Sequence, residues 1–107
     1  MIGFDIQKMM KQAQKMQDDM NSVQAELERL EVQGSAGGWA VTVYCNGKQE
    51  FSRVKITKEA LEDSEMLEDL VLAALKDANQ KVADATRERM ASVTAGLNIP
   101  GLNLPGF

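Results

Sequence analysis

The chain has 107 residues and a net charge of −4, from 12 basic and 16 acidic side chains. Apolar residues make up 44% and charged residues 26%, a composition that favours one globular domain over a disordered chain. There is no histidine and only one cysteine, Cys45, which excludes Ser-His and Cys-His nucleophile pairs, internal disulfides and CxxC sites. No apolar run is long enough for a membrane span, and no secretory signal is recognisable. We therefore expect a cytoplasmic protein that is not an enzyme and holds no metal or cofactor.

Residues 5–31 predict one long helix with Asp5 as its N-cap, because neither Gly nor Pro interrupts the stretch and good helix formers dominate it. Its apolar residues recur at alternating spacings of three and four, which is the pattern of a heptad seam. The seam consists of Ile6, Met9, Ala13, Met16, Met20, Val23, Leu27 and Leu30. A helix of roughly 40 Å is too long for the core of so small a domain to cover. Its partner is either a second copy of the chain or the C-terminal helix of the same chain.

Residues 32–57 predict a three-stranded antiparallel sheet, because apolar and polar residues alternate along its last two strands. The first strand spans 32–37 and ends at a bend at Gly37-Gly38. Asn46-Gly47 predicts a two-residue type I′ turn between the other two strands, which requires positive φ at both positions. The resulting register separates two sets of side chains. We expect Val41, Val43, Val54 and Ile56 on the core face, and Ala40, Thr42, Tyr44, Phe51, Arg53 and Lys55 on the other face.

The C-terminal part predicts two more helices and a tail. Thr57 is an N-cap candidate for a short helix, and Asp63-Ser64 offers the start of a long helix from about residue 65 to 93. From Gly96 onward a repeated pentad carries both prolines of the chain, which excludes a helix. We expect a single domain over residues 1–95 and a flexible tail over 96–107.

Three further features are weak candidates for chemistry. The glycines of residues 34–38 lack the Gly-Lys-Ser/Thr of a phosphate loop and suit a bulge or a tight bend. Cys45 has no histidine to activate it, so a buried or edge position is the better interpretation. The acids of residues 59–69 lack the order of a calcium loop, and acids at a helix N-terminus are explained by the helix dipole.

Charge is segregated along the chain. Residues 7–17 hold Lys8, Lys11 and Lys15 and no acid, whereas residues 59–79 hold seven acids and one lysine. The three lysines are spaced by three and four, so they share a helix face well away from the apolar seam. This strip can contact phosphates, although a lysine face that serves only solubility is the alternative.

Several segments occur together in the order of a known family: residues 11–17 (KQAQKMQ), 30–34 (LEVQG), Asn46-Gly47, 65–71 (EMLEDLV), 90–93 (MASV) and the Gly/Pro-rich tail. Over essentially its whole length, the chain resembles the YbaB/EbfC family of bacterial nucleoid-associated proteins. The resemblance implies an α+β domain of order α-β-β-β-α that forms a homodimer with projecting helices. It implies binding of double-stranded DNA with low sequence specificity, a place in the nucleoid, an influence on gene expression, and no catalytic activity.

The resemblance also implies DNA contacts on the N-terminal and C-terminal helices. The matching positions in this chain are Lys8, Lys11 and Lys15. Lys81, Arg87 and Arg89 are further DNA-binding candidates. Asp84 and Glu88 interrupt the second group, which does not align on one helix face. The alternative function is a helical protein-protein interaction module without DNA binding.

Overall fold

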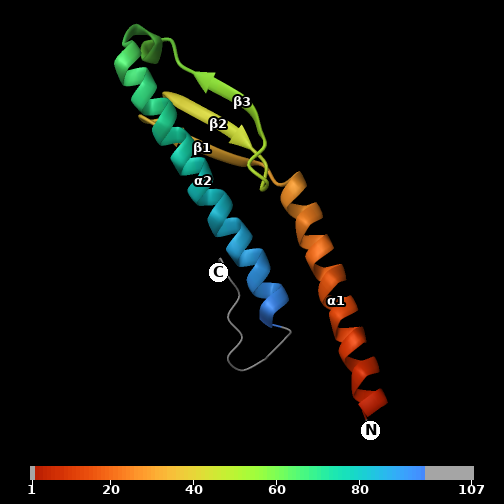
Figure 1. The fold of residues 1–107 in the computed structure, drawn as a ribbon. Coiled ribbons are helices and arrows are strands. Elements are labelled where there is room, and N and C mark those ends of the chain that lie inside the picture. The colour runs from red at the N-terminus through yellow and green to blue at the C-terminus, as the bar shows by residue number, and fades with distance from the viewer. Residues whose placement is uncertain (1, 96–107) are drawn as a thin grey trace.

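The structure, a computed structural model, describes residues 2–95 and the side chains of residues 5–93. The tail expected at 96–107 lies outside the described residues. The elements follow one another as α1 (Ile2–Arg29), β1 (Val32–Ala36), β2 (Val41–Cys45), β3 (Phe51–Ile56), a short 3₁₀ helix η1 (Glu59–Glu62) and α2 (Ser64–Ala95). This order confirms the α-β-β-β-α fold (Figure 1). The helix α1 begins at Ile2, so Asp5 lies within its first turn and is not the N-cap.

The three strands form one antiparallel sheet in the order β1-β2-β3. Val41 pairs with Ile56 and Val43 with Val54, which confirms the expected register over most of the second hairpin. The register shifts at the end of β2, where Cys45 pairs with Phe51. Phe51 therefore shares the helix-facing side with the buried Cys45, and the expectation that it lies on the other face is wrong.

The expected type I′ turn at Asn46-Gly47 is wrong. Within residues 2–95, positive φ occurs at Gly37, Gly38, Trp39 and Gln49, not at Asn46 or Gly47. The first two of these confirm the glycine bend between β1 and β2.

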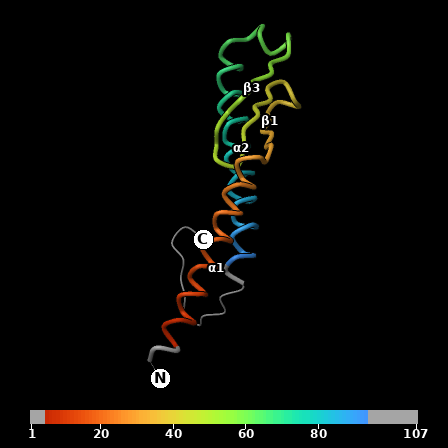
Figure 2. Tube along the Cα trace, turned by 90° about the vertical axis from the view of Figure 1, so that its right-hand side faces the viewer, coloured from red at the N-terminus to blue at the C-terminus, as the bar shows by residue number. Residues whose placement is uncertain are grey.

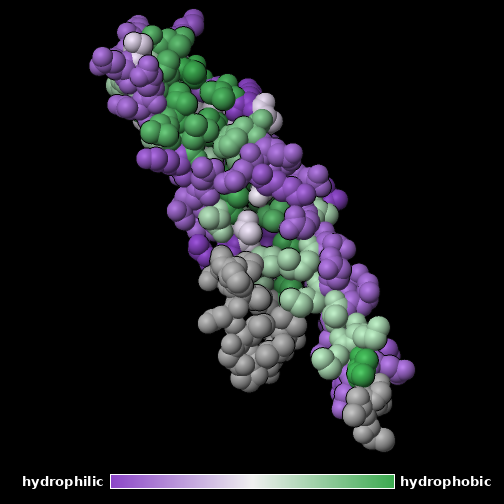
Figure 3. All heavy atoms as spheres, viewed as in Figure 1, coloured by the Kyte–Doolittle hydropathy of each residue, from purple (hydrophilic) through white to green (hydrophobic). Residues whose placement is uncertain are grey.

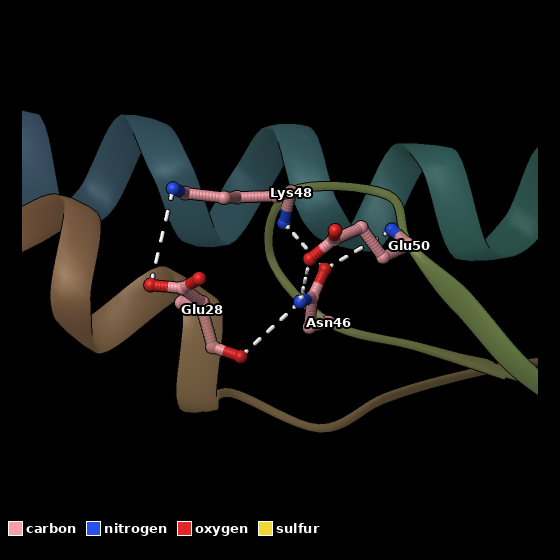
Figure 4. A network of polar contacts seen from close by, with 4 residues as sticks. All are labelled: Glu28, Asn46, Lys48 and Glu50. Atoms are coloured by element: carbon pink, nitrogen blue, oxygen red, sulfur yellow. Dashed lines mark hydrogen bonds and ion pairs between the residues drawn. The ribbon is translucent and has the colours of Figure 1, made fainter.

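The loop between β2 and β3 is closed by the side chain of Asn46 (Figure 4). Its Oδ1 accepts hydrogen bonds from the backbone N–H groups of Lys48 (2.9 Å) and Glu50 (3.0 Å). Its Nδ2 donates to Glu50 Oε1 (2.7 Å) and to the backbone oxygen of Glu28 (3.2 Å), near the end of α1. The loop is wider than a two-residue turn because Asn46 ties it to the helix.

The helix α2 runs along β1 and β2 and covers one face of the sheet (Figures 1 and 2). Ala74 and Ala78 are fully buried against Val41 and Val43. The two layers approach closely because Gly34 has no side chain: a Cβ built there would lie 2.6 Å from the Cβ of Ala78. Small residues on both elements therefore set the spacing between helix and sheet.

The helix α2 does not extend over the strand β3. Val54 and Ile56 share the helix-facing side of the sheet with Val43 and Val41, as expected. They are nevertheless exposed, Val54 to 54%, so the expectation that they belong to the core is wrong. The reason is that α2 follows β1 and β2 and leaves the third strand uncovered.

The apolar seam of α1 is covered along only part of its length. Val23 and Leu27 are buried in one cluster with Met90 and Val93 of α2, so the C-terminal helix of the same chain is the partner there. The helix α1 continues past the C-terminal end of α2 (Figures 1 and 2). Along that extension the seam is open, with Ile6 50% and Met9 66% exposed. The described molecule is consequently elongated, with extents of 73 × 25 × 15 Å.

Candidate nucleic-acid interface

The three lysines of α1 lie on the part of the helix that extends past α2. Lys8, Lys11 and Lys15 are all exposed, and within residues 5–93 none of them forms an ion pair. At 1.5 Å per residue the strip is roughly 10 Å long. Asp18, which follows it, accepts a hydrogen bond from Gln14 (3.3 Å) rather than from a lysine. These three ammonium groups are therefore available to an anion in solvent.

The helix that carries the strip is anchored at its other end. The N–H of Gly47 donates to the backbone oxygen of Leu27 (2.7 Å), and a Cβ at Gly47 would lie 2.8 Å from that oxygen. The Asn46 side chain adds its bond to Glu28, and the Lys48 ammonium lies 4.0 Å from the Glu28 carboxylate (Figure 4). Glycine at position 47 is thus required by close packing, and the hairpin loop fixes how α1 leaves the sheet.

The candidates on α2 are engaged within the chain. Lys81 donates to the backbone oxygen of Gln33 (3.0 Å) and pairs with Asp77 at 3.1 Å. Arg87 pairs with Asp84 at 3.2 Å. Arg89 lies 3.4 Å from Glu26 of α1 and donates to the backbone oxygen of Ala85 (3.3 Å). A phosphate would have to compete with these contacts, whereas the lysines of α1 present no such competition.

Lys81 has a structural role that sequence reasoning missed. Asp77, one turn before it, accepts a hydrogen bond from the backbone N–H of Ser35 (2.9 Å), and Lys81 binds the oxygen of Gln33. The N–H of Ser35 and the oxygen of Gln33 both belong to the free edge of β1, so Asp77 and Lys81 together cover that edge. The hydrogen bond from Ser35, and then the one from Lys81, lower the pKa of the Asp77 carboxyl.

The charge segregation of the sequence becomes a separation in space. The acids of η1 and the start of α2 lie at one end of the elongated molecule, and the lysine strip of α1 lies toward the other (Figure 1). An anionic partner approaching the N-terminal end of α1 meets a local excess of positive charge despite the net charge of −4.

The chain is similar to known proteins over nearly its whole length. A sequence model described as the YbaB/EbfC DNA-binding family matches residues 2–97, which include every described helix and strand. The chain belongs to the YbaB/EbfC DNA-binding family. It is 46% identical over 107 residues to a nucleoid-associated protein of Xylella fastidiosa strain 9a5c, covering all of this chain and 96% of that protein. It is 47% identical over 102 residues to one of Xanthomonas campestris pv. campestris strain B100, covering 94% and 96%.

A solved structure supports the fold. The crystal structure of an uncharacterized protein from Helicobacter pylori superposes with a TM-score of 0.67 at 24% identity, covering 78% of this chain and 89% of that one. The family and the names of the relatives describe DNA-binding, nucleoid-associated proteins, which is not a class of enzyme.

Cys45 is buried as expected, and burial raises the pKa of its thiol, which disfavours the reactive thiolate. Among the described residues, no three or more Cys, Asp or Glu side chains are placed to hold a metal ion. None of the described helices is long and apolar enough to cross a membrane.

The outer face of the sheet holds a second group of basic residues. Arg53 and Lys55 project there, as the register predicted, and the Arg53 guanidinium lies 5.3 Å from the centre of the Tyr44 ring. Sequence reasoning did not single out Trp39, which the glycine bend holds 62% exposed. A large aromatic residue directly after two glycines was the available signal.

Proposed function

We propose that this YbaB/EbfC protein binds the phosphate backbone of double-stranded DNA through Lys8, Lys11 and Lys15. The observation that carries the proposal is that these lysines are exposed and unpaired among the described residues, on a helix that projects past the rest of the domain. Lysine is a strongly hydrated point charge and suits contacts with phosphates. Lys81, Arg87 and Arg89 are secondary candidates, because each already contacts an acid of the same chain.

Low sequence specificity follows from the kind of contact. Lysine–phosphate contacts position a protein on DNA but do not read the bases. We expect the protein to bind DNA in the bacterial nucleoid, within the cytoplasm, since its relatives are named nucleoid-associated proteins. There we expect it to affect nucleoid organisation and gene expression.

The protein acts as a homodimer, and the surface that supports this lies between β3 and α2. Val54 and Ile56 are exposed on the helix-facing side of β3. Leu72, 53% exposed, is two helical turns before Asn79, whose side chain accepts a hydrogen bond from Gln49 in the loop that leads into β3. Leu72 therefore lies on the side of α2 that faces β3.

Hydrophobic residues gather over this region in the space-filling view (Figure 3). The strand β3 is also an edge strand, with backbone groups free to bond to another chain. A second copy of the same surface would cover both the apolar side chains and the edge.

DNA binding is tested by mobility shift with several unrelated duplexes. Replacing Lys11 and Lys15 by Glu should abolish the shift for every duplex, and circular dichroism should show an unchanged helix content because Glu is as good a helix former as Lys. Lys76→Glu is the matched control, since Lys76 is exposed on α2, and it should leave the shift unchanged. An undiminished shift with the double variant would refute the proposed site. No shift for the wild-type protein would favour the interaction module.

The dimer is tested by light scattering at micromolar concentration. We expect the mass of two chains for the wild-type protein and of one chain for Val54→Lys, because a lysine in an apolar interface is buried without a partner. Val54 is already solvent-exposed in the single chain, so the variant should remain folded. Met9→Lys is the matched control on the open part of the α1 seam. Dissociation by Met9→Lys alone would show that the seam is the interface instead.

A further inference from the structure

We propose that the outer face of the sheet binds single-stranded nucleic acid, as a site separate from the duplex-binding lysines of α1. Unpaired bases stack on Trp39 and on the Arg53–Tyr44 pair, and Lys55 and Lys58 contact the phosphates. The site does not depend on the proposed duplex binding, because it lies on different elements.

A groove is already present on this face. It has a volume of about 480 Å³ and is lined by Gln33, Trp39, Thr42, Tyr44, Lys55, Ile56, Thr57 and Lys58. No carboxylate occurs among these lining residues, whereas Lys55 and Lys58 supply two positive charges. The described part of the chain offers neither lysine an ion pair. The groove therefore suits a polyanion.

The aromatic residues are held in place for stacking. Trp39 has φ of 74°, a conformation that L-residues rarely adopt, so its backbone position is determined by the surrounding turn. That turn is closed by a hydrogen bond from the N–H of Ala40 to the oxygen of Gly37 (3.3 Å) and joined to the end of β3 by one from Thr57 to Ala40 (2.9 Å). Little conformational freedom of the backbone remains to be lost when a base stacks on the indole.

The Arg53–Tyr44 pair forms a second stacking surface, on the sheet itself. Gln33, Tyr44 and Arg53 are direct neighbours across the three strands, as are Ser35, Thr42 and Lys55 two residues away on the same face. The Arg53 guanidinium lies over the Tyr44 ring, and Arg53 is exposed, so the guanidinium is accessible to a base. Aromatic side chains and guanidinium planes on a sheet, flanked by lysines, form the kind of surface on which unpaired bases stack.

A duplex fits this surface less well than a single strand does. Its bases are stacked on one another, so a duplex offers phosphates to Lys55 and Lys58 but no base face to Trp39. The lysine strip of α1 can contact phosphates but offers no surface for stacking, since residues 5–17 include no aromatic residue. The two surfaces therefore distinguish single strands from duplexes.

Trp39 is the only tryptophan of the chain and reports directly on the site. A short oligothymidylate titrated into the wild-type protein should quench its fluorescence saturably, and an oligouridylate arm compares RNA with DNA. Heparin, a polyanion without bases, should leave the emission unchanged. The absence of quenching by either oligonucleotide, or equal quenching by heparin, would overturn the proposal. Blue-shifted emission of the free protein would also overturn it, because another copy would then already cover Trp39.

Variants separate this site from the duplex site, with binding followed by the anisotropy of a labelled oligothymidylate. Trp39→Ala should weaken binding by roughly 5- to 150-fold, the usual effect of losing one base stack, and Trp39→Phe should restore part of it. Replacing Lys55 and Lys58 by Gln should also weaken it, whereas Lys76→Gln should not. Replacing Lys11 and Lys15 by Gln should weaken duplex binding only. Unchanged single-strand affinity in a folded Trp39→Ala variant, or its loss in the Lys11/Lys15 variant, would refute a separate site.

Discussion

Replacing Gly34 by alanine places a methyl group where β1 lies directly against α2. The new Cβ would be 2.5 Å from the backbone nitrogen of Ala78 and 2.6 Å from its Cβ, and it would also meet the carbonyl oxygen of Ala74. Ordinary contact begins at 3.4 Å, so α2 must move away from the sheet by about 1 Å. Two of these obstacles are backbone atoms of a packed helix, which cannot rotate aside as a flexible side chain could.

The shift separates Ala74, Ala78 and Val82 from the sheet along the main core. A gap of about 0.5–1 Å forfeits a quarter to a half of the dispersion energy of a contact. We expect Gly34→Ala to lower the free energy of unfolding by about 2–3 kcal/mol, within the range for overpacked cores, and the melting temperature by roughly 10–20 °C.

Gly38→Ala is the matched control, measured with Gly34→Ala by urea denaturation followed by circular dichroism. Nothing lies within 4 Å of a Cβ at Gly38, so only its φ of +63° opposes the substitution. That conformation costs an alanine about 1 kcal/mol. A Gly34→Ala protein no less stable than Gly38→Ala would refute the close approach of helix and sheet.

Three further changes test the remaining contacts by the same denaturation assay. Asn46→Ala should lower the free energy of unfolding by about 1–2 kcal/mol, because it removes the side chain that closes the loop and binds α1. Lys48→Ala should lower it by less, because the ion pair of Lys48 is long and exposed, and equal losses would contradict this reasoning. Leu27→Ala should lower the free energy of unfolding by about 2–4 kcal/mol because Leu27 is buried, and Met9→Ala by less than about 0.5 kcal/mol because Met9 is exposed. A large effect of Met9→Ala would show that the seam is covered along its whole length. The pKa of Asp77 is lowered on folding, so its carboxylate stabilises the protein above the unfolded pKa and loses this contribution as the pH falls through the lowered value. Asp77→Asn should therefore be less stable than the wild type at neutral pH, by a difference that shrinks as the pH falls below about 4, and a pH-independent difference would refute the linkage.

The order of elements and the strand register could be predicted because they rest on local signals. The alternation around Val41 and Val54 fixes which side chains share a face, and the structure has that pairing. Asp63 was a plausible helix start, and its Oδ1 accepts a hydrogen bond from the N–H of Met66 (3.1 Å) at the first turn of α2. Such caps involve residues three apart and are visible in the sequence.

The errors arose where a distant element decides the outcome. Alternation indicates the face on which Val54 lies but not whether a helix covers it, and α2 does not reach β3. Asn46-Gly47 has the composition of a tight turn, but Asn46 binds Glu28, 18 residues away, and the loop widens.

For the candidate site, helical spacing was enough to place Lys8, Lys11 and Lys15 together on an exposed face. Asp77 and Lys81 are one turn apart, so their ion pair is also readable from the sequence. The bond from Lys81 to Gln33, 48 residues away, is not, because it depends on how α2 lies against the edge of β1.

The measurement that tests the central claim most directly is the salt dependence of duplex affinity. Six lysines, three from each chain of a dimer, give a slope of log K against log salt of about −3 to −5 if most of them touch phosphates, at roughly −0.9 per contact. Lys11→Gln changes both chains and should flatten the slope by up to about 2 for every duplex sequence, whereas Lys76→Gln should leave it unchanged. A slope that Lys11→Gln does not alter, or that Lys76→Gln alters as much, would contradict phosphate binding by the lysine strip of α1.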